Sequence, residues 1–214
     1  RAVSTVLELC KTRLPDNMHI PADQIQVLTP TRKGPCGTVN LNRLLQEALN
    51  PKAPGKREIL WGERVFRVGD RIMQTRNDYD VVWQKADGTV GTGMFNGDVG
   101  RIVEIDQSGE WLALDFDGRT APYSTEMLSE IDLAYAQTVH KAQGSEYRCV
   151  VLAAMPSAPS LMVRGVLYTA LTRARELLVI VGDDAAVRSM AANDKQQKRY
   201  SGLKWRLCHA GENG

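Results

Sequence analysis

Two polar segments carry most of the groups in this chain that could do chemistry, and an apolar stretch follows each of them. Residues 134–146 are short, polar and broken by glycine, and they lead into Cys149–Met155. Residues 166–175 have helical character and contain two arginines, and they lead into Leu177–Val181. Both apolar stretches are typical of buried strands. An α/β protein presents polar groups at the edge of its sheet, where ligands bind, so we expect a ligand site beside these strands.

Arg173 is the candidate catalytic residue. A guanidinium group has a permanent charge and a planar fork that matches phosphate oxygens. During ATP hydrolysis negative charge spreads over the γ-phosphoryl oxygens, and an arginine delivered from a second domain stabilises it. The alternative role is structural, because the helix dipole favours a cation at a helix C-terminus. The residue type alone leaves both roles open, whereas Arg175, expected on another face of the same helix, is interpreted as structural.

Gly144 and Glu146 are candidates for nucleotide binding. A glycine allows a phosphate to approach the backbone closely, and a carboxylate can accept hydrogen bonds from ribose hydroxyls. A turn glycine and a solvated glutamate are the structural alternatives. Gln143 lies between these residues and the start of the segment, and it could serve a nucleotide or a nucleic acid.

Thr138, His140 and Lys141 begin the same segment. Hydroxyl, imidazole and ammonium groups along one loop suit the phosphates and stacked bases of a single strand. A lone histidine is more often structural, but hydrogen-bond donors flank this one on a loop that ends in glycine. We therefore favour a role in nucleic-acid binding.

Thr31, Arg32 and Lys33 are further candidates for the same strand. They follow the predicted strand Ile25–Leu28, at the end where an open sheet gathers its ligands. The sequence does not decide which of the two basic side chains reaches DNA or a phosphate.

The elements that would position these groups alternate between helices and strands. Apolar spacing predicts helices over residues 1–14, 39–49 and 162–175, a short helix near 139–143, and strands over 25–28, 131–138, 149–155 and 177–181. Pro15 is expected to end the first helix. This alternation predicts an α/β fold.

Between about residues 61 and 126 the pattern changes to short runs of β-branched and apolar residues. These runs are separated by Asp87-Gly88, Asn96-Gly97, Ser108-Gly109 and Asp117-Gly118. Such pairs supply the positive φ that tight hairpins need. We therefore predict an α/β domain made of residues 1–60 and 127–214, interrupted by a small antiparallel barrel over residues 61–126.

The bulk composition limits the partners only weakly. The 214 residues carry a net charge of +2, which neither demands nor excludes nucleic acid. Residues 195–206 hold five basic and no acidic residues, a pattern that fits a solvated face and a DNA-proximal patch equally well. The four cysteines and three histidines show no ligand spacing, so we predict no metal site and a reducing cytoplasm. No apolar run approaches the roughly 18 residues that a membrane span requires.

The order and spacing of these segments resemble the RecD-like helicases of superfamily 1, the family of the exodeoxyribonuclease V alpha subunit. Ala134–Glu146 resembles helicase motif V, and Val166–Arg175 resembles motif VI. Residues 25–51, which include Thr31–Gly37, are similar to the motif IV region. Residues 68–100, which include Phe95–Gly100, are similar to a small barrel that this family inserts. The resemblance covers about residues 23–207.

The resemblance implies a RecA-like second motor domain of the P-loop NTPase type, with a parallel sheet and an SH3-like barrel inserted. It implies that Arg173 is the arginine finger, that Gly144 and Glu146 lie beside the nucleotide, and that Thr138 and His140 contact DNA. The implied ligands are ATP with Mg²⁺ and single-stranded DNA, and the implied partner is an N-terminal motor domain of the same protein. The implied setting is a bacterial cytoplasm without membrane contact, with movement from 5′ to 3′.

One departure from the family is the phosphate-binding loop Gly-x-x-x-x-Gly-Lys-Ser/Thr, which the 214 residues do not contain. Pro54–Arg57 lacks the hydroxyl residue and a preceding strand, and Gly182–Asp184 only superficially imitates a magnesium-binding pair. With Arg1 in place of a starting methionine, we expect the C-terminal half of a motor, without ATPase activity alone and with its Mg²⁺ ligands in the missing N-terminal domain. Two alternatives stay open: the helicase part of a conjugative relaxase, and a non-catalytic nucleic-acid-binding module.

Overall fold

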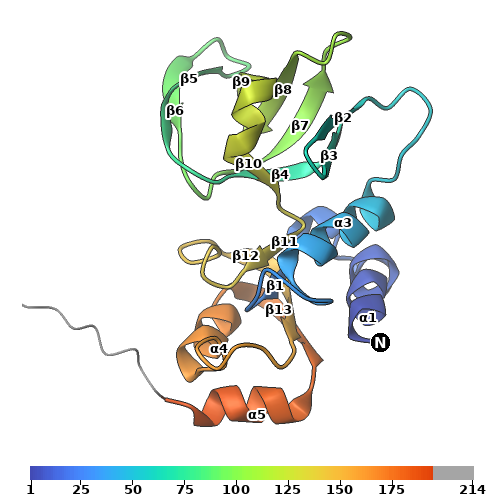
Figure 1. The fold of residues 1–214 in the computed structure, drawn as a ribbon, viewed down its shortest axis with the longest axis vertical. Coiled ribbons are helices and arrows are strands. Elements are labelled where there is room, and N and C mark those ends of the chain that lie inside the picture. Colours follow the sequence, from blue (N-terminus) through green and yellow to red (C-terminus); the bar gives the residue numbers. More distant parts are fainter. Residues whose placement is uncertain (195–214) are drawn as a thin grey trace, which may run out of the picture.

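The computed structural model describes residues 1–194, which form an α/β part and an all-β part (Figure 1). The α/β part is built on a sheet whose strand order is β11-β1-β12-β13, and every neighbouring pair in it is parallel. Its strands are β1 (Ile25–Thr29), β11 (Ala136–Thr138), β12 (Tyr147–Ala154) and β13 (Ala174–Gly182). The predicted α/β class with a parallel sheet is confirmed.

Helices cover both faces of this sheet because its side chains alternate between two cores. Along β12, Cys149 and Val151 belong to one core and Val150 and Leu152 to the other, as the two-residue period of a strand requires. The first core lies under the N-terminal helices and the second under the C-terminal ones (Figure 1). The N-terminal set is α1 (Ala2–Glu8), a π-helical turn (Leu9–Arg13), α2 (Leu14–Met18) and α3 (Thr38–Leu49), and the C-terminal set is α4 (Arg164–Leu171) and α5 (Asp184–Ala192).

The all-β part is a seven-stranded antiparallel sheet in the order β10-β4-β7-β8-β9-β5-β6, and it encloses a core of its own. Beside it, β2 pairs with β3 as a separate two-stranded hairpin. The strands are β2 (Glu58–Trp61), β3 (Arg64–Arg67), β4 (Arg71–Gln74), β5 (Asp78–Gln84), β6 (Val90–Met94), β7 (Val99–Ile105), β8 (Trp111–Phe116), β9 (Arg119–Ser124) and β10 (Ile131–Leu133). Short 3₁₀ helices occupy Ala22–Gln24 and Thr125–Glu130.

The turns of the all-β part confirm the prediction from the glycine pairs. Gly88, Gly97, Gly109 and Gly118 all have positive φ. Between β8 and β9, Asp117 has φ 54° and Gly118 has φ 78°, which is the geometry of a two-residue hairpin turn with both central residues left-handed.

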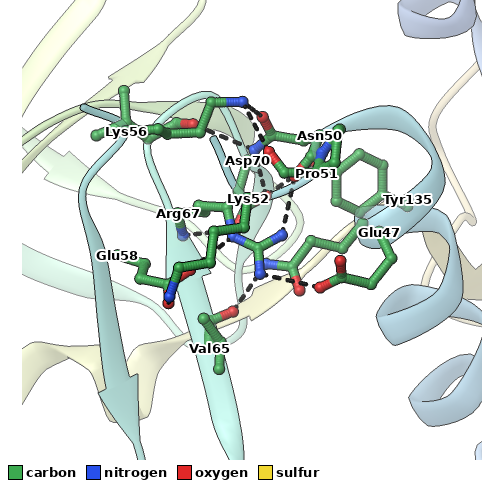
Figure 2. A network of polar contacts seen from close by, with 12 residues as sticks. Glu47, Asn50, Pro51, Lys52, Lys56, Glu58, Val65, Arg67, Asp70 and Tyr135 are labelled. Atoms are coloured by element: carbon green, nitrogen blue, oxygen red, sulfur yellow. Dashed lines mark hydrogen bonds and ion pairs between the residues drawn. The ribbon is translucent and has the colours of Figure 1, made fainter. Parts of the chain in front are cut away.

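A buried polar network joins the all-β part to α3 (Figure 2). Asp70, which is fully buried, accepts hydrogen bonds from Gln46 Nε2 at 2.5 Å, Asn50 Nδ2 at 2.7 Å, the Arg67 backbone N–H at 2.7 Å and Tyr135 OH at 2.9 Å. Burial raises the pKa of Asp70, although these four donors lower it. The network thus connects α3, the β3–β4 turn and the segment before β11.

Arg67 extends this network with its buried guanidinium group. Its Nε donates to Glu58 at 2.9 Å, its Nη2 to Glu47 at 2.9 Å and its Nη1 to the carbonyl of Asn50 at 2.9 Å (Figure 2). A buried charge is tolerated when its donors find acceptors in this way. The β2–β3 hairpin is therefore tied to α3 as well.

Two of the elements predicted for residues 131–143 are wrong. The predicted strand over residues 131–138 is two strands, β10 and β11, which belong to different sheets. The chain leaves one sheet at Ala134–Tyr135 and enters the other, so the apolar residues of this short segment serve two cores. Residues 139–143, predicted as a short helix, form turns instead.

Two helix ends also differ from the prediction. The first helix does not stop at Pro15, because α2 continues to Met18 with this proline in its first turn, directly after the π-helical turn. The turn before this proline has the wider π-helical hydrogen-bond pattern, so Pro15 does not follow a regular α-helical turn. The helix predicted over residues 162–175 is α4, which ends at Leu171, and Arg175 lies in β13.

The predicted boundaries at 60/61 and 126/127 stay predictions. The basic stretch 195–206, interpreted as either a solvated face or a DNA-proximal patch, lies outside the described residues.

Candidate functional site

The predicted site residues fall at two opposite edges of the parallel sheet. Glu146 and Arg173 directly precede β12 and β13, so they lie at the amino ends of these strands. The Tyr147 backbone N–H donates to the Arg173 carbonyl at 2.8 Å, which holds the two segments side by side. Thr31 and Thr138 lie at the other edge, where β1 and β11 end with Thr29 opposite Thr138.

The Arg173 side chain closes the end of α4 and reaches the loop before β12. Its Nη1 donates to the Ser145 carbonyl at 2.9 Å, its Nε to the Thr169 carbonyl at 3.1 Å and its Nη2 to Thr172 Oγ1 at 3.1 Å. All three acceptors are uncharged, and no carboxylate within residues 1–194 forms an ion pair with Arg173. The positive charge is therefore uncompensated and can meet an anion.

Gly144 and Glu146 leave this loop open to solvent. Gly144 has φ +86°, and a Cβ built on it would meet no atom within 4 Å. A positive φ favours glycine, and the empty space before the backbone leaves room for a ligand. Glu146 is exposed. Because Ser145 lies between them, the contact with Arg173 brings Gly144, Glu146 and Arg173 together, whereas Gln143, the fourth residue predicted for the nucleotide, lines the second groove described below.

At the carboxyl edge, four predicted residues line a groove of about 840 Å³, which we call the first groove. They are Arg32, Lys33, Thr138 and Lys141. Burial lowers the pKa of Lys141, Asp132 raises it and Arg32 lowers it further. The walls of the first groove come from α3, the β2–β3 hairpin and the loop after β1, so it lies between the α/β part and the hairpin.

Thr31 braces this loop, and its side chain does not line the groove. Its Oγ1 donates to the Lys33 carbonyl at 3.3 Å, and its backbone N–H donates to Thr29 Oγ1 at 3.5 Å. These contacts hold the backbone of the loop that carries Arg32 and Lys33.

His140 and Gln143 line a second groove, of about 1040 Å³, together with Tyr168 and Thr169 of α4. The turn at residues 139–143 therefore separates the first groove, reached by Thr138 and Lys141, from the second groove. Tyr168 is 67% exposed. We did not predict Tyr168 as a site residue, although an aromatic residue in the segment before Arg173 was a signal for it.

Two further residues of the first groove, Arg64 and Asp132, were also missed. Arg64 Nη1 donates to Asp132 Oδ1, and Arg32 Nη2 lies 4.0 Å from Asp132 Oδ2. The two residues of the close pair are 68 positions apart, so no local sequence signal could have found it.

Among the described residues, no group of three or more His, Cys, Asp or Glu side chains could hold a metal ion. Asp183 accepts from the Ala185 N–H at 2.9 Å as the N-cap of α5, and Asp184 pairs with Arg188 at 2.7 Å. These carboxylates stabilise a helix terminus. No helix within residues 1–194 is long and apolar enough to cross a membrane.

Comparisons with known proteins cover both parts of the structure. Residues 41–116 match the SH3 domain of ATP-dependent RecD-like DNA helicases, and residues 133–181 match the C-terminal domain of UvrD-like helicases. The ATP-dependent RecD2 DNA helicase of Deinococcus radiodurans is 37% identical over 185 residues, which are 86% of this chain and 24% of the relative. The RecBCD enzyme subunit RecD of Mycolicibacterium smegmatis is 34% identical over 190 residues, which are 88% of this chain and 30% of the relative. The chain thus spans 24% and 30% of the length of these two relatives.

Solved structures of Pif1 helicases show the same fold. A structure of two coordinating Pif1 helicases at forked double-stranded DNA matches 98% of this chain and 48% of its own, with a TM-score of 0.51 and 17% identity. A Pif1 helicase from Bacteroides in complex with ADP-AlF3 and single-stranded DNA matches 98% of this chain and 50% of its own, with a TM-score of 0.50 and 17% identity. The match extends over both parts, which agrees with an SH3-like domain attached to a parallel α/β domain.

Proposed function

Because this chain belongs to the RecD-like helicases of superfamily 1 over the region it shares with them, we propose that it forms the second motor lobe of an ATP-dependent DNA helicase that moves 5′ to 3′. The first lobe is an N-terminal motor domain of the same protein. ATP binds between the two lobes with Mg²⁺, whose ligands belong to the N-terminal lobe.

The amino edge of the sheet forms this lobe's side of the nucleotide site. Arg173 exchanges the Ser145 carbonyl for the γ-phosphoryl oxygens, where its planar fork stabilises the charge that develops during hydrolysis. Glu146 accepts hydrogen bonds from the ribose hydroxyls, and Gly144 allows the nucleotide to approach the backbone. The observation that carries this proposal is a cation without an acidic partner, hydrogen-bonded to the loop that presents Gly144 and Glu146.

The carboxyl edge forms part of the track for single-stranded DNA. Arg32, Lys33 and Lys141 bind phosphates from the first groove, and Thr138 donates its hydroxyl to the same strand. The strand then crosses the turn at residues 139–143 to His140 in the second groove.

One segment connects the two edges. Residues 138–146 begin opposite Thr29 and end directly before β12, which starts at Tyr147, two residues before the Cys149 that pairs with Ile25. Along the strand direction, the two ends of this segment are about six strand residues apart, or roughly 20 Å at the rise of a β-strand. A movement of this segment upon nucleotide binding would therefore change the position of the residues that contact the DNA strand.

A second candidate function is a nucleic-acid-binding module without catalysis, which the absence of a phosphate-binding loop from these 214 residues favours. ATP turnover separates the two. We expect the 214-residue chain to bind an oligonucleotide without hydrolysing ATP, and the complete protein that contains it to hydrolyse ATP when DNA is added. Two results would overturn the proposal: no DNA-stimulated turnover by the complete protein, or turnover by the 214-residue chain that disappears on changing Arg173.

A further inference from the structure

Asp132 places a negative charge in the middle of the basic first groove. Arg64 donates to its Oδ1, and Arg32 Nη2 lies 4.0 Å from its Oδ2. The Asp132 side chain is 32% exposed, so it is neither buried in a core nor freely solvated. One carboxylate thus lies between an arginine of the α/β part and an arginine of the β2–β3 hairpin.

Lys141 lies near this pair without an ion pair of its own among residues 1–194. It lines the first groove and is partly buried, and it interacts electrostatically with both Asp132 and Arg32. An amine that is partly desolvated without a bonded partner gains from an additional anion. Its position therefore indicates space for a negative group beside Asp132.

The remaining charges of the first groove favour the same ligand. Five cationic side chains and three carboxylates line it, the carboxylates being Glu47, Glu63 and Asp132. Glu47 is already bonded to the buried guanidinium of Arg67, at 2.9 Å. Because cations are in excess, the first groove attracts an anion even with Asp132 in place.

Arg64 is held firmly, yet part of its guanidinium group is available. Its Nη1 also donates to the Ile131 carbonyl at 2.8 Å, and its guanidinium carbon lies 4.5 Å from the centroid of the Trp61 ring. Its Nε and Nη2 have no hydrogen-bond partner in the described part of the chain. An arginine fixed in this way presents the rest of its fork without a further loss of side-chain entropy.

We propose that Arg64, Arg32 and Lys141 form a binding site for a backbone phosphate of the DNA strand, in which Asp132 positions Arg64 and competes with the phosphate for Arg32. This inference rests on the proposed function and adds the β2–β3 hairpin as a second wall of the strand track. The phosphate replaces Asp132 as the partner of Arg32 and gives Lys141 an anionic partner, while Arg64 keeps its contact with Asp132. The carboxylate thereby weakens binding to any strand that does not fill the site.

The test is fluorescence anisotropy of a labelled oligodeoxythymidylate with the 214-residue chain across a salt series. Asp132→Asn retains an oxygen for Arg64 and removes the competing charge, so we expect binding to become tighter by roughly threefold to tenfold at low salt. Arg64→Met keeps an unbranched stem beside Trp61, and we expect weaker binding with a log–log salt slope shallower by about 0.7. A gain of affinity in Asp132→Asn cannot result from misfolding.

The chain offers a matched control pair in Arg119 and Asp98, outside both grooves. Arg119 Nη2 lies 3.2 Å from Asp98 Oδ2, its Nε donates to the Phe116 carbonyl at 3.2 Å, and its guanidinium carbon lies 5.9 Å from the Trp83 ring centroid. Asp98→Asn and Arg119→Met change the charge by the same amounts, and we expect them to leave affinity within twofold of the original chain.

The outcomes separate this inference from the function on which it rests. If the unchanged chain does not bind the oligonucleotide, the proposed strand track is wrong. If the chain binds and Arg32→Gln weakens binding, but Asp132→Asn and Arg64→Met behave like the control pair, the track stands and the phosphate site at Arg64 is wrong. Weaker binding by Asp132→Asn would also overturn the competing role of this carboxylate.

Discussion

Arg173 donates from its Nη1 to the backbone carbonyl of Ser145 at 2.9 Å, which ties the end of α4 to the loop before β12. The proposed arginine finger is thus bonded to an uncharged oxygen of the loop that contains Gly144 and Glu146. A guanidinium group held by neutral acceptors can move to a phosphate without first breaking a salt bridge.

The first prediction concerns the structural part of this contact. Arg173→Ala removes hydrogen bonds to two carbonyls, and at a partly buried site we expect the free energy of unfolding to fall by about 1 kcal/mol. Urea unfolding followed by circular dichroism measures this change. Arg175→Ala, at an exposed position of β13, is the matched control and should stay within about 0.5 kcal/mol. A loss above roughly 3 kcal/mol for Arg173→Ala would make this residue chiefly a structural one.

The second prediction separates the two edges of the sheet. Thr138→Ala and His140→Ala should each weaken binding to an oligonucleotide, and each lost phosphate contact should make the log–log salt slope shallower by about 0.7. Glu146→Ala should leave this binding unchanged and weaken nucleotide binding by the complete protein, because Glu146 lies at the opposite edge. Anisotropy titrations and nucleotide titrations measure the two affinities. An equal loss of both ligands in all three variants would mean that residues 138–146 act as a folding element.

The third prediction concerns the joint between the two parts. Each carboxylate oxygen of Asp70 accepts two hydrogen bonds. In Asp70→Asn the side-chain NH₂ group takes the place of one of these oxygens, and in either orientation it faces two donors. The Tyr135 hydroxyl can rotate and accept from this amide, so at least one buried donor is left without an acceptor, which should lower the free energy of unfolding by about 1–3 kcal/mol. Asp80→Asn, at an exposed position of β5, is the control. Unfolding in two separate steps would show that the joint couples the two parts, whereas an unchanged stability would contradict its role.

The sequence was sufficient for the features that depend on local conformation. Turns were predicted at Gly88 and Gly118 because an Asx-Gly pair supplies the positive φ of a tight hairpin. The antiparallel strands between these turns were predicted on the same ground, because a hairpin turn joins antiparallel neighbours. The alternation along β12 was not predicted, because a strand buried on both faces reads as a continuous apolar run.

The features that depend on distant segments could not be predicted. Nothing in Ile131–Thr138 marks the point where the chain passes from one sheet to another. The pairing of Arg64 with Asp132 depends on where a hairpin lies against β10, and local patterns do not contain that information. The contact of Arg173 with Ser145 was missed for the same reason, although each segment was recognised separately.

The steady-state rate of ATP hydrolysis by the complete protein, measured at saturating ATP and DNA for Arg173→Ala, tests the central claim most directly. We expect kcat to fall by roughly 10³-fold or more, with a much smaller change in nucleotide affinity. Arg173→Lys should restore little of the rate, because a point charge cannot reproduce the fork, and Arg175→Ala should retain it. An unaltered kcat in Arg173→Ala or Arg173→Lys would remove Arg173 from the active site and contradict the account.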